Sequence, residues 1–238
     1  MSLGETGANQ AFYWSARPGK AFRQKGKCVN NSGMFSSAKP INYEEVYEDL
    51  VKKLAQADYR HALVHLGACE AGDSVTMEVF GRTCYIGPQG VRATDGERLD
   101  FTVRIVTAHY LLRAGRGDLT GEWRSYRDFK DGAFFHGAFS QTSEQRIARI
   151  FTGRIADLKI ASEKLGGEAL DEDLGGDFSI RFTALPRIPL ALVFYDADDD
   201  FPASAKILFD ASAPLFLDME CLAVLGTILA DKLHQGPE

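Results

Sequence analysis

A chain of 238 residues with 45% hydrophobic and 25% charged residues has the composition of an ordinary globular protein, which excludes disorder throughout. Four widely spaced cysteines exclude a disulfide scaffold and a cysteine-based zinc or iron–sulfur knuckle, so we expect reduced thiols and a cytoplasmic setting. No segment approaches the roughly 20 apolar residues that cross a bilayer, so we expect no membrane contact.

Residues 1–41 are predicted to form a flexible basic arm, because they show no regular apolar period and are rich in Gly, Ser, Asn and Lys. Six basic residues in this segment stand against Glu5 alone, a net charge of +5 that leaves −11 to the rest of the chain. Residues 42–238 are predicted to form a single α+β domain. Because that domain is acidic, we expect it not to bind nucleic acid.

The first half of this domain is predicted to combine helices with one hairpin. Apolar residues recur at helical spacing over residues 43–55, and a second helical segment is expected over 59–66. Residues 101–113 are apolar nearly all round, which predicts a helix buried on several sides. Asn42 can cap the first of these helices, and Gly67 follows the second. Between the second and third helices, alternating residues over 75–86 predict two strands joined at Gly81.

The second half is predicted to contain two further helices and a second strand pair. Residues 118–139 show no period and are expected to form a long ordered loop with short strands. The remaining predictions are a helix over 143–165, strands over 178–183 and 190–195, a segment of unsettled type over 206–210, and a helix over 218–234 capped by Asp218. The fold class is therefore α+β, with a small and mainly antiparallel sheet from two hairpin-like pairs, covered by about four to five helices.

The segment over residues 121–139 is the predicted ligand-binding site. It concentrates aromatic, arginine and histidine side chains outside the predicted helices and strands, at Trp123, Arg124, Tyr126, Arg127, Phe135 and His136. A planar ligand could stack on these rings while an arginine meets its carboxylate. The alternative is that the rings hold a long loop against the core.

Two other clusters suggest metal binding, each with an argument against it. His61, His65 and Cys69 have the spacing of one helical face, but no fourth ligand is identifiable and Gly67 is expected to end the helix before Cys69. The acidic residues over 196–200 have the spacing of a calcium loop but lack its glycine and its distal glutamate, which favours a solvated turn.

No complete catalytic motif is present, and the sequence identifies no cofactor. No serine or cysteine adjoins a histidine in a nucleophile motif, and the glycine-rich phosphate-binding patterns are absent. Cys69, Cys84 and Cys221 are interpreted as small packed residues. The sequence therefore predicts no catalytic residues and leans against an enzyme.

Several short runs occur in a characteristic order: residues 108–112 (AHYLL), 119–123 (LTGEW), 126–129 (YRDF), 165–167 (LGG), 184–186 (ALP), 201–203 (FPA), 207–210 (ILFD) and 217–218 (LD). Over residues 43–234 the chain resembles an uncharacterised domain family of anaerobic bacteria and archaea. Members of that family stand alone or follow a module that holds a four-iron four-sulfur cluster. The resemblance implies an anaerobic, cytoplasmic accessory protein linked to one-carbon or corrinoid metabolism. The arm contains only Cys28, so it does not imply a cluster here.

The leading functional hypothesis is a non-catalytic ligand-binding or accessory protein that uses residues 121–139. One alternative is a metal-dependent enzyme that uses His61, His65 or His136. The other is a protein-interaction module that docks on an acidic partner through the basic, aromatic residues 12–27. The sequence identifies neither the ligand or partner nor the oligomeric state.

Overall fold

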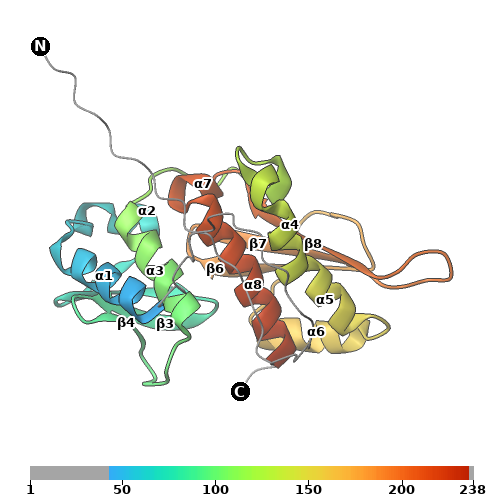
Figure 1. Ribbon diagram of the computed structural model, residues 1–238, viewed down its shortest axis with the longest axis horizontal. Coiled ribbons are helices and arrows are strands. Elements are labelled where there is room, and N and C mark those ends of the chain that lie inside the picture. The colour runs from blue at the N-terminus through green and yellow to red at the C-terminus, as the bar shows by residue number, and fades with distance from the viewer. Residues whose placement is uncertain (1–42, 236–238) are drawn as a thin grey trace, which may run out of the picture. The chain divides into compact units, whose positions relative to one another are not determined.

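The computed structural model describes residues 43–235, all within the compact unit Ile41–Glu238 (Figure 1). The predicted arm over residues 1–41 lies outside the described residues. The described residues form an α+β fold with two separate four-stranded antiparallel sheets. This confirms the predicted fold class. The two predicted strand pairs do not share one small sheet, however, because each belongs to a separate four-stranded sheet.

The first sheet is a meander. Its strands follow chain order and are β1 (Cys69–Ala71), β2 (Ser74–Val79), β3 (Arg82–Gly87) and β4 (Gly90–Ala93). Buried residues alternate along β2, as expected for a sheet with one face on the core. That face is covered by the helices α1 (Tyr43–Gln56) and α3 (Phe101–Arg113). The 3-10 turn η1 (Arg60–Ala62) and α2 (Leu63–Leu66) join α1 to β1.

The second sheet has the order β5-β8-β7-β6, so its edge strand β5 comes from a distant part of the chain. The strands are β5 (Trp123–Ser125), β6 (Phe178–Leu185), β7 (Ile188–Tyr195) and β8 (Ser204–Asp210). All of β7 except Tyr195 is buried, as expected for a central strand. The two sheets meet where the Phe80 N–H donates to the Ala184 carbonyl at 3.0 Å.

The helix α8 (Met219–Gln235) packs against both halves of the fold. Figure 1 shows it between α3 on one side and α4 (Gly132–Thr142) and α5 (Glu144–Phe151) on the other. Leu222, Leu225 and Leu229 on α8 are fully or almost fully buried in one continuous apolar core. The remaining elements are η2 (Tyr126–Asp128), α6 (Ile155–Lys164) and α7 (Ala213–Phe216). None of the helices in the described part is long and apolar enough to cross a membrane.

Two local predictions need correction, and one segment that the sequence left open can now be assigned. The helix expected over 143–165 is two helices, α5 and α6, because Gly153 between them has a φ of +67°, which breaks the helical path. The loop expected over 118–139 ends in the helix α4, which shows no apolar period because both Phe134 and Phe135 are exposed. The unsettled segment over 206–210 is part of β8.

Candidate functional site

His109, Asp218 and Cys221 form the candidate site. His109 lies on α3, Asp218 immediately precedes α8, and Cys221 lies in the first turn of α8. Each offers one potential ligand atom, an imidazole nitrogen, a carboxylate oxygen or a thiol sulfur, and these atoms all lie within 4.8 Å of one another. Cys221 is buried, His109 half-buried and Asp218 exposed, so the cluster opens to solvent on one side.

Local sequence explains why two of these groups adjoin. Asp218 caps α8, and its Oδ1 accepts a hydrogen bond from the backbone N–H of Cys221 at 2.8 Å. Leu217 and Leu222, both buried, flank the cap at the positions of a hydrophobic staple. The cap therefore fixes the carboxylate against the turn that carries the thiol.

The turn before α8 is held by side chains from other elements. The Arg113 guanidinium donates from Nε to the Leu215 carbonyl at 3.2 Å and from Nη2 to the Pro214 carbonyl at 2.7 Å. The Tyr126 hydroxyl donates to the Met219 carbonyl at 2.7 Å. Because Arg113 is four residues after His109 on α3, the same helix that carries the imidazole also anchors the segment that carries Asp218.

Burial sets the protonation of the site. It lowers the pKa of His109, and Lys53 lowers it further, while Asp218 opposes both. Burial also raises the pKa of Cys221 well above its ordinary value, and Asp218 and Glu220 add to that rise. At neutral pH the imidazole is therefore neutral and the Cys221 sulfur is a thiol.

This arrangement suits a cation better than it suits covalent catalysis. A cysteine nucleophile needs a thiolate, and the raised pKa of Cys221 disfavours one. A bound divalent cation reverses that effect, since a coordinating thiol is deprotonated by the metal. A neutral imidazole is likewise the form of histidine that binds metals.

A family model described as a domain of unknown function (DUF3786) matches residues 58–232, which is more than half of the chain. The chain belongs to the DUF3786 family. No curated protein and no solved structure matches the chain. The matched part of the DUF3786 domain includes His109, Asp218 and Cys221.

The structure spreads the predicted ligand-binding residues of the DUF3786 domain over three consecutive elements. Trp123 and Arg124 lie on β5, Tyr126 and Arg127 in η2, and Phe135 and His136 on α4. Arg124 pairs with Glu122 through Nη2 and Oε1 at 2.9 Å, and Arg127 is exposed.

Among these residues, Tyr126 faces the core and not the solvent. It is fully buried and stacks on Phe139 with ring centroids 4.3 Å apart. Its hydroxyl is engaged by the Met219 carbonyl. For this residue the geometry matches the alternative interpretation, in which the rings of the segment hold it against the core.

His61, His65 and Cys69 do not form a group whose ligand atoms come together within the described part of the chain. Gly67 has a φ of +64° and ends α2, so Cys69 leaves the helical face and enters β1, as the sequence suggested. The acidic segment over 196–200 forms a hydrogen-bonded turn, in which Asp198 Oδ1 accepts the N–H groups of Asp200 and Phe201 at 2.9 and 2.7 Å.

Sequence reasoning identified Asp218 as a cap and Cys221 as a packed residue, but it did not bring them together with His109. The available signal was local: a carboxylate and a thiol three residues apart at the start of a helix adjoin each other. The histidine comes from a helix 109 residues earlier than Asp218, and only the packing of α3 on α8 places it there.

Proposed function

We propose that the DUF3786 domain binds a thiophilic divalent metal ion through His109, Asp218 and Cys221 and acts as a ligand-binding accessory protein. The proposal is carried by one observation, which is that three side chains with metal-binding atoms converge within 4.8 Å. It keeps the hypothesis of a ligand-binding protein and moves the site from residues 121–139 to the contact between α3 and α8.

The three potential ligand atoms need to move only slightly to bind one metal ion. Ligand atoms bound to a tetrahedral zinc at about 2.0–2.3 Å lie roughly 3.5 Å from one another. The potential ligand atoms of the cluster all lie within 4.8 Å of one another. Side-chain rotations that shift these atoms by about an ångström therefore bring them to the spacing of a tetrahedral site. Asp218 can supply Oδ2 to the metal while Oδ1 keeps its capping hydrogen bond to Cys221.

The set of ligand types points to a class of metal. Thiolate and imidazole ligands favour zinc and neighbouring transition metals, whereas magnesium and calcium prefer oxygen ligands alone. Three protein ligands also leave one tetrahedral position open, which is the arrangement of metal sites that bind an exchangeable ligand. The start of α8 supports the two anionic ligands, because the positive end of the helix dipole stabilises a thiolate and a carboxylate.

The metal-dependent enzyme considered from the sequence would, on this proposal, use His109 in place of His61, His65 or His136. An open metal position serves a bound ligand and a reacting substrate equally well, so accessory protein and enzyme share the same centre. From the family resemblance we also propose an anaerobic, cytoplasmic setting beside one-carbon or corrinoid metabolism. Such a setting would protect a thiolate ligand from oxidation.

Metal content tests the proposal. The full chain, purified without an affinity tag and without oxygen, is expected to carry close to one equivalent of zinc or a related transition metal by elemental analysis. Cys221→Ser is expected to lose most of it, while Cys69→Ser, at an exposed position on β1, is expected to retain it. Equal metal content in the two variants, or no metal in the native protein after incubation with zinc, would refute the site.

A further inference from the structure

The helix α4 leaves one side uncovered. Its other side packs against α5, α8 and η2, and Figure 1 shows it at the upper edge of the fold with α5 and α8 below it. Phe134 on the uncovered side is 87% exposed, more than any other large apolar side chain of the described part. Together with the exposed residues Ala133, Phe135, Gly137 and Ala138 it forms the α4 face. Contact of this apolar surface with water is unfavourable, so a partner surface that covered it would be stabilised.

The α4 face carries no charge. No Asp, Glu, Lys or Arg occurs from Gly132 to Ser143, and the one titratable residue of this segment, His136, is half-buried. The charges just before the helix sum to zero, since they are those of Arg127, Asp128, Lys130 and Asp131. A partner that is recognised through ion pairs therefore finds no charged group on this face.

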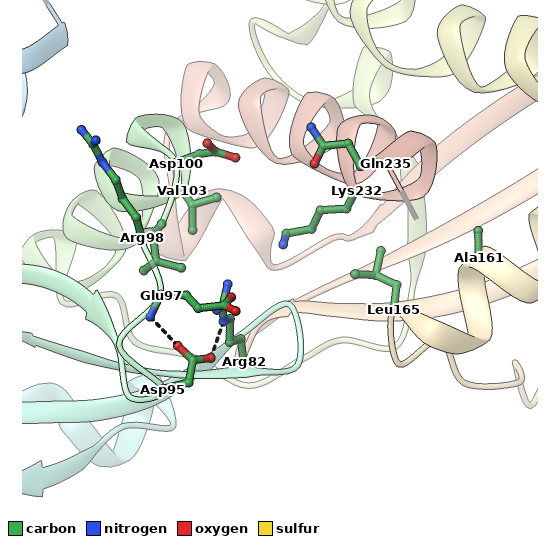
Figure 2. A pocket seen from close by; sticks show the side chains of 11 residues that line it. Arg82, Asp95, Glu97, Arg98, Asp100, Val103, Ala161, Leu165, Lys232 and Gln235 are labelled. Atoms are coloured by element: carbon green, nitrogen blue, oxygen red, sulfur yellow. Dashed lines mark hydrogen bonds and ion pairs between the residues drawn. The ribbon is translucent and has the colours of Figure 1, made fainter. Parts of the chain in front are cut away.

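The cavity near the end of α8 has the opposite character (Figure 2). Its volume is about 470 Å³, and its lining carries three basic and three acidic residues: Arg82, Arg98, Lys232, Asp95, Glu97 and Asp100. Arg82 is paired with Asp95, through Nε and Oδ2 at 2.8 Å, and also with Glu97. Because the six charges sum to zero, the net charge of the cavity selects no class of ligand, and the α4 face is the more specific feature.

The α4 face combines a protruding ring with a gap. Gly137 lies one turn after Phe134 on the same side of the helix. A Cβ added at Gly137 would meet nothing within 4 Å, so the surface is open there. Ala138, next to it, adds only a methyl group. One helix therefore carries both halves of a knob-and-hole contact.

We propose that the α4 face is the contact surface of a homodimer, in which α4 packs antiparallel against α4 of a second copy. A contact about a twofold axis pairs residue i with residue j, and j with i. Phe134 of each copy lies over Gly137 of the other, and Ala133 meets Ala138. Two copies with a net charge of −6 repel each other, so they meet most favourably where neither carries charge.

A membrane fits the α4 face less well. Helices that lie in a membrane interface are rich in Lys and Arg on their polar face. The helix α4 contains neither residue, and the negative net charge of the chain repels anionic lipid headgroups. The composition of the helix therefore favours a protein surface of the same uncharged kind.

The area of the face sets the expected strength of the dimer. Burying two copies of Phe134 removes about 300–400 Å² from water. The rest of an 11-residue helix brings the total to about 800 Å², below the roughly 1,200–2,000 Å² of stable complexes. We therefore expect a weak dimer, with a dissociation constant of about 10–100 μM.

Sedimentation velocity of the full chain, from about 5 to about 500 μM, measures this association. The sedimentation coefficient is expected to rise from that of a monomer to that of a dimer. High salt should leave the dimer as tight or tighter, because it screens the repulsion between the two copies. A native protein that stays monomeric, or a dimer that dissociates in high salt, would overturn the proposal. Monomeric protein that binds phosphatidylcholine vesicles through Phe134 would assign the face to a membrane and equally refute the dimer.

Matched variants locate the contact. Phe134→Ser removes the ring, and Gly137→Gln fills the gap with a residue that favours the helix, so each is expected to weaken dimerisation at least about tenfold. Phe201→Ser, at a 70% exposed position in the turn after β7, is the control and is expected to dimerise as the native protein does. Thermal melting confirms that each variant is folded. Unchanged dimerisation in both α4 variants, or an equal loss in the control, would contradict a contact through α4.

Discussion

Asp210, at the end of β8, is the buried carboxylate whose removal we expect to destabilise the domain most clearly. It is only 3% exposed, and its Oδ1 accepts hydrogen bonds from the backbone N–H and hydroxyl groups of Thr120 and Ser212 at 2.6–3.0 Å. Its Oδ2 accepts the Gly121 N–H at 2.7 Å. These bonds tie the segment before β5 to the end of β8 and the start of α7.

The cost of each substitution follows from these contacts. In Asp210→Ala the Ser212 N–H stays buried without an acceptor, at about 1–3 kcal/mol, while water can reach the exposed Thr120 and Gly121. With the charge-assisted bonds lost as well, we expect a total of about 2–5 kcal/mol. Asp210→Asn keeps an acceptor at Oδ1 but turns an amide NH₂ toward the Gly121 N–H, and we expect about 1–3 kcal/mol.

Urea unfolding measures these differences. The midpoint concentration should fall in the order native, Asp210→Asn, Asp210→Ala, with an unchanged slope. Asp199→Asn, in the exposed turn after β7, is the matched control and should stay within about 0.5 kcal/mol of the native protein. If Asp210→Asn were as stable as that control, the hydrogen bonds would not contribute as argued.

The same network predicts a pH dependence. Burial alone would raise the pKa of Asp210, but hydrogen bonds from Ser212, Thr120 and Gly121 outweigh it, and the pKa lies below its ordinary value. A lowered folded pKa stabilises the fold fully above the unfolded value of about 3.9, and that stability is lost as the pH falls through the folded pKa. The difference between the native protein and Asp210→Asn should therefore be constant from pH 5 to 7 and shrink below about pH 4.

Further predictions concern packing and a buried hydroxyl. Gly226→Ala should destabilise the domain, by about 1–3 kcal/mol in thermal or urea unfolding, because a Cβ there would lie 2.5 Å from the Phe139 ring. A Cβ added at Gly137, on the exposed side of α4, would meet nothing within 4 Å, so Gly137→Ala should instead stabilise the domain by about 0.5–1 kcal/mol. If both substitutions changed the free energy of unfolding in the same direction, the packing described here would be contradicted. Tyr110→Phe should cost about 1–2 kcal/mol, since its hydroxyl donates to the Leu66 carbonyl at 2.9 Å and accepts the Arg187 N–H; a neutral effect would contradict this.

Local signals in the sequence predicted the helices and strands whose apolar pattern faces a single core. The staple and cap around Asp218 fixed the start of α8, and alternation along residues 75–86 fixed the hairpin of β2 and β3. The pattern failed at α4, where Phe134 is exposed and Phe139 is buried on the same helix. An apolar helix with an uncovered side has no period to detect.

The pairing of strands and helices that lie far apart in the chain could not be predicted from the sequence. Nothing in residues 123–125 specifies that Arg124 pairs with Phe209 on β8, because edge-strand register depends on the finished sheet. The candidate site likewise depends on contacts that form only in the finished fold. Asp218 and Cys221 adjoin through local helix geometry, whereas His109 joins them only because α3 packs beside α8.

Cobalt binding tests the central claim most directly. Co²⁺ added to the metal-free protein should give one equivalent of binding, with visible bands of a tetrahedral site and a near-ultraviolet sulfur-to-cobalt charge-transfer band. The charge-transfer band should disappear in Cys221→Ser, and the visible bands should weaken or shift in His109→Ala. A native spectrum without sulfur charge transfer, or one that persists in Cys221→Ser, would contradict metal coordination at this cluster.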